Sequence, residues 1–323
     1  MKFFKKYTIE ACMLSVFLLF TSCSSDDNAK EDFGGEEQGG DTTPIDPKKE
    51  AAIALYNDFY LASSQTAQDS QWIDGNPSTC NAGSVKKSTR DKIMMRLQYY
   101  RRATGLTNVI TENMSKSAKA QEAALMMKVN GTLSHSPPKD WICYTENGKE
   151  AAGKSNLTTG SGVRAIDSYI KDAGSNNFAA GHRRWLLWPK LQEIGIGNTD
   201  RSNVIWVIGN AGNVPEDNPN FIAWPPQGFV PGRLVYRRWS FSIAGADFKN
   251  ASIQMKDSNG VDISLSIEDV KNSFGDNTIV WVPEGIQSNI SSDTFYKVIL
   301  KNVIINNTPK DFEYEVILFN PDN

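Results

Sequence analysis

The chain has 323 residues, of which 40% are hydrophobic and 22% charged, and its formal net charge at pH 7 is -3. This composition is typical of a globular protein and excludes a wholly disordered or fibrous chain. Because there is no basic excess to neutralise phosphates, we expect no nucleic acid among the partners.

The N-terminal segment has the pattern of an export signal. Lysines precede a short apolar run over residues 11–20, and small residues then lead to Cys23. The pattern predicts a signal peptide over residues 1–22 and a bacterial lipoprotein whose membrane anchor is a lipid on Cys23. The two aspartates at positions 26 and 27 resemble the export signal of surface lipoproteins, so we expect an outer-membrane protein exposed at the cell surface. The alternative is a plain signal peptide with an incidental cysteine.

Residues 23–48 are rich in Gly, Ser, Asp and Glu and predict a flexible tether. Beyond it lie only two cysteines, Cys80 and Cys143. In an oxidising compartment this pair predicts a disulfide. A nucleophilic thiol paired with a histidine is the alternative.

Helical periodicity governs the first half of the remaining chain. The first segment begins near residue 49, the second is capped by Ser88 or Thr89, and the third opens at Thr111 or Asn113 and ends before Gly131. Residues 131–162 predict a loop, and a fourth helix runs from 163 to 174. Short strands follow at 194–197 and 203–209. We therefore predict an α+β layered domain over residues 49–226.

Strand patterns govern the last part of the chain. Phe312, Tyr314 and Val316 alternate with polar residues, and Asn259-Gly260 indicates a hairpin. Several short strands over residues 232–323 predict an all-β sandwich of immunoglobulin-like type.

Both histidines of the chain lie in short motifs. One motif is Leu133-Ser134-His135-Ser136, and the other is Gly181-His182-Arg183-Arg184-Trp185. Together with Gln98-x-x-Arg101-x-x-x-Gly105 and Ala120-Gln121-x-x-Ala124-Leu125, this order resembles the CAP superfamily in its bacterial form. That superfamily comprises cysteine-rich secretory, antigen 5 and pathogenesis-related-1 proteins. The resemblance covers roughly residues 50–215.

The resemblance implies an α-β-α sandwich in which His135 and His182 share a cleft, together with Ser155 and Asp172. In the family two glutamates flank the histidines. Ser155 stands at the first of these positions, and the second corresponds to Asp172 or is absent. Several members bind a divalent metal there, so the resemblance implies that His135 and His182 are metal ligands, for zinc for example.

A third metal ligand would have to come from a carboxylate, because catalytic zinc usually has three protein ligands. The candidates are Glu146, Glu150, Asp167 and Asp172. Trp185 and its neighbouring tryptophans interleave with aliphatic residues, which favours a place in the core over a stacking surface.

Two functions are argued from these patterns, and a structural lipoprotein with a vestigial cleft is a third possibility. The first is an extracellular binding module that takes a lipid, glycan or protein ligand in the histidine cleft; the loss of the first glutamate favours it. The second is a metal-dependent hydrolase of peptides or envelope polymers, for which His135 and His182 would be the catalytic residues.

Overall fold

The structure is a computed structural model that describes residues 46–66, 68–69, 72–209 and 211–322. The described residues belong to one compact unit. The predicted signal peptide over residues 1–22, the lipid on Cys23 and nearly all of the predicted tether lie outside the described residues. Within the described part of the chain, no helix is both long enough and apolar enough to cross a bilayer.

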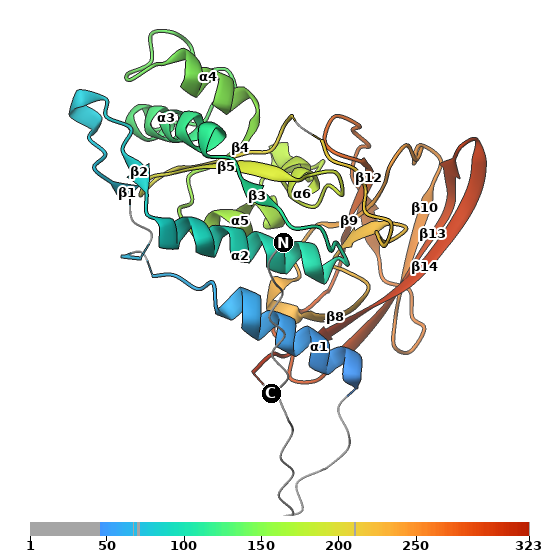
Figure 1. Cartoon of the computed structure of the whole chain (residues 1–323). Helices are drawn as coiled ribbons and strands as arrows, with labels where there is room; N and C mark the ends of the chain where they lie inside the picture. The colour runs from blue at the N-terminus through green and yellow to red at the C-terminus, as the bar shows by residue number, and fades with distance from the viewer. Residues whose placement is uncertain (1–45, 67, 70–71, 210, 323) are drawn as a thin grey trace, which may run out of the picture. The chain divides into compact units, whose positions relative to one another are not determined.

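The first region is an α+β fold built around a four-stranded sheet of order β3-β5-β6-β4. The pair β3–β5 is parallel, whereas β5–β6 and β4–β6 are antiparallel. Helices α3 and α4 cover one face of this sheet, and α2 and α5 lie on the other (Figure 1). The strands are β3 (Thr111–Glu112), β4 (Ser155–Thr158), β5 (Glu193–Asn198) and β6 (Asn203–Trp206). The helices are α1 (Pro47–Leu55), which a π-helical turn (Tyr56–Leu61) continues, α2 (Lys87–Ala103), α3 (Met114–Asn130), α4 (Glu146–Gly153), α5 (Val163–Lys171) and α6 (Gly181–Leu186). A small hairpin of β1 (Trp72–Ile73) and β2 (Ser84–Val85) precedes α2.

The predicted caps are confirmed for α3 and wrong for α2. The Asn113 side chain accepts hydrogen bonds from the first backbone N–H groups of α3, and Gly131 ends that helix in a left-handed conformation. Helix α2 instead begins at Lys87, without a side-chain cap. The Thr89 hydroxyl donates to Asp69 O at 2.9 Å, so a tertiary contact uses the group that was expected to cap the helix.

The prediction of a loop over residues 131–162 is wrong in its second half, which contains α4 and β4. The Thr145 hydroxyl caps α4 by accepting from Gly148 N at 2.9 Å. Gly148 serves close packing here, since a Cβ there would lie 2.5 Å from Met126 Sδ of α3. Strand β4 has only four residues, which is too short for alternation to reveal it.

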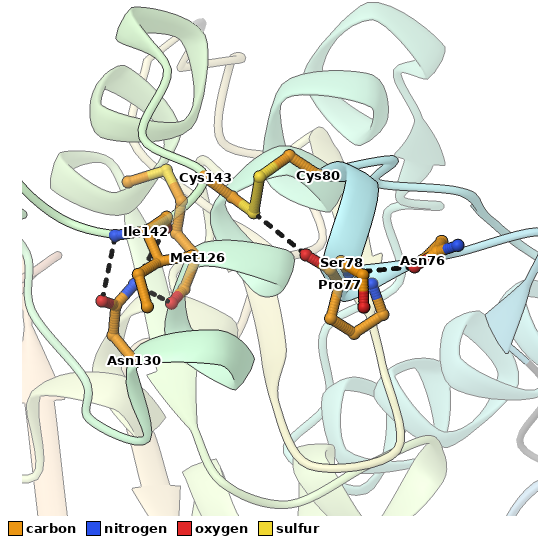
Figure 2. Close-up of a disulfide and its surroundings, with 8 residues drawn as sticks. All are labelled: Asn76, Pro77, Ser78, Cys80, Met126, Asn130, Ile142 and Cys143. Carbon is orange, nitrogen blue, oxygen red and sulfur yellow. Dashed lines mark hydrogen bonds between the residues drawn. A yellow bond between two sulfur atoms is a disulfide. The ribbon is translucent and has the colours of Figure 1, made fainter.

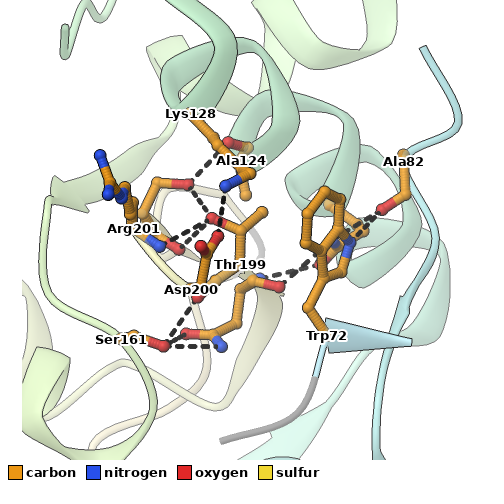
Figure 3. A network of polar contacts seen from close by, with 11 residues as sticks. Trp72, Ala82, Ala124, Lys128, Ser161, Thr199, Asp200 and Arg201 are labelled. Atoms are coloured by element: carbon orange, nitrogen blue, oxygen red, sulfur yellow. Dashed lines mark hydrogen bonds and ion pairs between the residues drawn. The ribbon is translucent and has the colours of Figure 1, made fainter. Parts of the chain in front are cut away.

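Helix α3 lies directly on the backbone of β5. A Cβ at Gly197 would lie only 2.1 Å from Ala120 O, so glycine is what permits this approach. The turn between β5 and β6 is tied to the same helix by polar contacts (Figure 3). The Ser202 hydroxyl donates to Ala124 O at 2.6 Å, and Lys128 pairs with Asp200 at 2.6 Å.

The predicted disulfide between Cys80 and Cys143 is confirmed (Figure 2). It joins the short 3-10 turn Pro77–Thr79 to the loop between α3 and α4. The loop is also held at its base, because Asn130 exchanges side-chain hydrogen bonds of 3.0 and 3.1 Å with the backbone of Ile142. The segment that carries His135 is therefore fastened on both sides.

The C-terminal region is all-β and contains two four-stranded sheets, of order β10-β13-β14-β8 and β11-β12-β9-β7. Strand β8 pairs in parallel with β14, and the other pairs are antiparallel. The strands are β7 (Ile222–Trp224), β8 (Gly228–Pro231), β9 (Trp239–Ile243), β10 (Ser252–Asp257), β11 (Leu265–Ile267), β12 (Asn277–Pro283), β13 (Thr294–Ile305) and β14 (Thr308–Phe319). An immunoglobulin-like topology stays a prediction.

Asn259-Gly260 does form a turn, and the residues on its two sides pair in a short antiparallel bridge, Lys256 with Asp262, so the predicted hairpin is confirmed over these few residues. Beyond the bridge, β10 pairs with β13 and β11 pairs with β12. Strand β7 lies before residue 226, the predicted domain limit, and pairs with β9 of the C-terminal region. Its Trp224 is fully buried, with its ring centroid 5.0 Å from that of Tyr100 on α2. One hydrophobic cluster accordingly contains residues of both regions.

Candidate functional site

Both histidines line one cavity of about 380 Å³, a size within the usual range of small-molecule sites. Strand β4 supplies Ser155 and Asn156, and helix α6 supplies Gly181, His182 and Trp185. His135, from the loop before α4, lies on the exposed rim. The remaining lining residues come from neighbouring loops and turns: Gly153, Asn176, Asn177, Ile208, Ser273 and Phe274.

Asp172 fixes the position of His182. Its Oδ1 lies 2.7 Å from His182 Nδ1, and its Oδ2 accepts from His182 N at 2.9 Å. The carboxylate is 1% exposed and does not line the cavity. Asp172 and Ala180 both adopt left-handed conformations, which turn the chain so that the end of α5 meets the start of α6. If Nδ1 carries the proton, Nε2 of His182 keeps a lone pair for a ligand or a substrate proton.

His135 is oriented in a similar way by a neutral group. Its Nδ1 lies 2.9 Å from Ala152 O, near the end of α4. A carbonyl can only accept, so Nδ1 carries a proton, and in the neutral imidazole the lone pair is on Nε2. Both imidazoles are thus held through Nδ1, and in the neutral form with the proton on Nδ1 each has Nε2 as an acceptor.

Ser155 has a buried polar atom with no partner. The residue is 5% exposed, and its Oγ makes no hydrogen bond to any of the described residues. The side-chain nitrogen of the neighbouring Asn156 does have a partner, since it donates to His182 O at 3.0 Å. A buried hydroxyl without a partner costs about 1–3 kcal/mol, so a hydrogen bond to a molecule in the adjoining cavity would stabilise Ser155.

Three of the four predicted cleft residues, His135, Ser155 and His182, therefore line one cavity, and Asp172 lies beneath it. The other carboxylates considered as metal ligands are bound elsewhere. Each pairs with a cation: Glu146 with Lys139, Glu150 with Lys119 and Lys154, and Asp167 with Arg96.

The residues present do not fit a catalytic zinc centre. Such a centre usually takes three protein ligands, and the cavity offers two imidazole nitrogens. Within the described part of the chain, no group of three or more His, Cys, Asp or Glu side chains is placed to hold a metal ion. Asp172 is engaged with His182, so it orients a histidine and is not available as a third ligand.

The two arginines that follow His182 are buried behind the cavity and bind neighbouring elements. Arg183 is 1% exposed and donates to Ile170 O, Arg238 O and the Ser240 hydroxyl. Burial lowers the pKa of Arg183 to about 10. This side chain ties α6 to α5 and to the C-terminal region.

Sequence reasoning missed several residues of the cavity. Trp185 was expected in the core, yet it is half-buried and lines the cavity. Ser273 and Phe274 belong to the loop between β11 and β12, about ninety residues after His182. No motif pointed to them, because nothing in the sequence pattern fixes which β loop meets α6.

Residues 95–208 match the family CAP, described as the cysteine-rich secretory protein family. The matched segment runs from α2 to the end of the central sheet and includes both histidines. The chain thus contains a CAP domain, as the motif order predicted. A comparison with curated proteins finds no match.

Proposed function

We propose that this protein, which contains a CAP domain over residues 95–208, is an extracellular binding module. Its ligand, a lipid, a glycan or a protein segment, would occupy the cavity between His135 and His182. The observation that carries this proposal is the unpartnered, buried Ser155 hydroxyl in a cavity where two imidazoles each keep one nitrogen available. These three groups would be the polar contacts of the proposed ligand.

The proposal places the protein outside the cytoplasm. The disulfide supports this, since disulfides persist in oxidising compartments. The signal-like N-terminus supports a lipid on Cys23 and an outer-membrane location facing outward. Metabolic labelling with an alkyne fatty acid tests the anchor: we expect label on the wild type and none on Cys23→Ala. Label on both would contradict the proposed anchor.

The binding function can be tested by NMR, because the chain has only two histidines. Their imidazole Hε1 signals are assigned by comparison with His135→Gln and His182→Gln. Pools of lipids, glycans and peptides are then added to the exported protein. We expect one pool to move both imidazole signals, whereas a pool that binds without moving either signal would place the binding surface elsewhere.

A hydrolase acting on peptides or envelope polymers is the second candidate. The contact between Asp172 and His182 favours it, because a buried carboxylate at Nδ1 orients an imidazole for general-base chemistry. His182 Nε2 would take a proton from an attacking water. The resemblance to the CAP superfamily also implies a metal such as zinc, but the donor groups of the described residues do not fit one, so the proton transfer is assigned to His182 alone.

Turnover of fluorogenic peptides and of labelled envelope polymer tests this second candidate. We expect Asp172→Asn to lower kcat if His182 is the base, because the amide holds the imidazole without stabilising its charged form. Equal turnover in the wild type and in a His182→Gln variant would exclude His182 as the base.

A further inference from the structure

We infer that the loop between β11 and β12, through Ser273 and Phe274, forms a binding wall of the histidine cavity, and that the cavity takes a neutral, polyhydroxylated ligand such as a sugar unit of a glycan. This inference rests on the proposed binding function and makes the C-terminal region part of the site.

The loop is held by the same short helix that carries His182. Arg184 of α6 donates from Nη1 to Lys271 O at 2.6 Å and from Nη2 to Asp276 O at 2.8 Å. The Trp188 indole N–H donates to Asp276 Oδ1 at 3.0 Å. Arg184 is 4% exposed, so these charge-assisted bonds lie largely out of water. The loop between β11 and β12 is therefore held by helix α6, which also carries His182, and by Trp188 just after that helix.

Phe274 packs directly on the first residue of α6. A Cβ at Gly181 would lie 3.1 Å from atoms of the Phe274 ring, so glycine at this position lets the ring approach the helix. The Arg184 guanidinium also lies 5.5 Å from the centre of that ring. Ser273 and Phe274 both line the cavity, so the C-terminal region supplies part of its wall.

The chemistry of the lining indicates the class of ligand. None of the lining residues is Asp, Glu, Lys or Arg, so a charged ligand would lose water without gaining an opposite charge. The lining offers amides, hydroxyls and imidazoles, which both donate and accept hydrogen bonds as sugar hydroxyls do. It also offers two aromatic side chains, Trp185 and Phe274, against which the apolar face of a sugar ring can pack.

A purely apolar ligand fits less well. It offers no hydrogen bond to the Ser155 hydroxyl, which has no partner among the described residues. A polyhydroxylated ligand can supply that hydrogen bond. The unpartnered hydroxyl therefore favours a glycan over a lipid chain.

Calorimetric titration of the exported protein tests the inference. The probes are three neutral disaccharides (lactose, mannobiose and chitobiose), an acidic disaccharide that contains glucuronic acid, and phosphatidylcholine vesicles. We expect binding of at least one neutral disaccharide. Ser155→Ala and Phe274→Leu should each weaken it by about two- to tenfold, and Phe274→Tyr should weaken it less. The matched control is Phe295→Leu on β13, where the side chain is 44% exposed and lies outside the cavity lining.

The outcomes separate the inference from the function on which it rests. Binding that Ser155→Ala weakens and Phe274→Leu leaves unchanged would overturn the role of the loop and keep the binding function. Binding of vesicles or of the acidic disaccharide alone would overturn the ligand class. If no probe binds in a way that depends on Ser155, the inference fails, and the binding function then depends on the NMR test, in which peptide pools are also added; it fails too if no pool moves either imidazole signal. Thermal unfolding of each variant shows whether the loop substitution has altered the fold, and Phe274→Tyr keeps the test valid if Phe274→Leu has done so.

Discussion

Removing the disulfide between Cys80 and Cys143 should destabilise the protein by about 4 kcal/mol. The two cysteines are separated by 63 residues in the sequence, and the chain-entropy relation for a closed loop of that length gives this value at 25 °C. Cys80→Ala/Cys143→Ala unfolds in urea with a lower midpoint, and we expect the slope of the transition to rise, because the unfolded chain exposes more surface without the link.

The matched comparison is the wild type with and without reductant. Reductant should shift the wild type to the midpoint of the double variant and should leave the double variant unchanged. A decrease in the free energy of unfolding of less than about 1 kcal/mol would refute the reasoning. The loop between α3 and α4 would then be held by its other contacts alone. The His135 imidazole signal reports on the same loop and should broaden when the link is lost.

Three further outcomes are expected. Hydrogen bonds from Lys119 and Lys154 lower the pKa of Glu150 from 4.5 to about 2, so this carboxylate stabilises the fold above pH 4.5 and its contribution is lost as the pH falls toward 2. In Glu150→Gln the unfolding midpoint should depend less on pH across that window. An unchanged pH dependence would argue against the two contacts. Gly197→Ala should destabilise by about 1–3 kcal/mol or more in urea unfolding, because its Cβ would meet Ala120 O; a neutral effect would mean that α3 can move away. A chelator should leave the thermal midpoint unchanged, since the cavity offers two imidazoles and no third metal ligand; a drop in the midpoint would reveal a metal site that the donor set does not suggest.

The sequence predicted the parts of the fold that depend on strong local signals. Helix α3 has an asparagine cap at one end and a glycine at the other, and both act as expected. The buried strand at Asn203–Trp206 was visible as an apolar run. Strand β4 was not visible, because its four residues, Ser155–Thr158, are too few and too polar to stand out from a loop.

The site was predictable only where a motif marked it. The histidine motifs placed His135 and His182 in one cavity, but the role of Asp172 depends on a left-handed turn that joins α5 to α6. From the sequence alone, Glu150 was as good a candidate for a third metal ligand beside the histidines as Asp172. Phe274 could not be predicted, because its position follows from how the C-terminal region packs on α6.

The shared hydrophobic cluster around Tyr100 and Trp224 has a consequence for how the chain opens. Amides of the central sheet and amides of the β-sheets should exchange with solvent through the same large opening event, since neither part can leave without exposing the tryptophan of β7. A chain cut after residue 208 would carry the matched CAP segment and still display an uncovered aromatic face. We expect such a fragment to be cleaved by proteases and to aggregate more readily than the whole chain, because the C-terminal region covers apolar surface of the CAP domain.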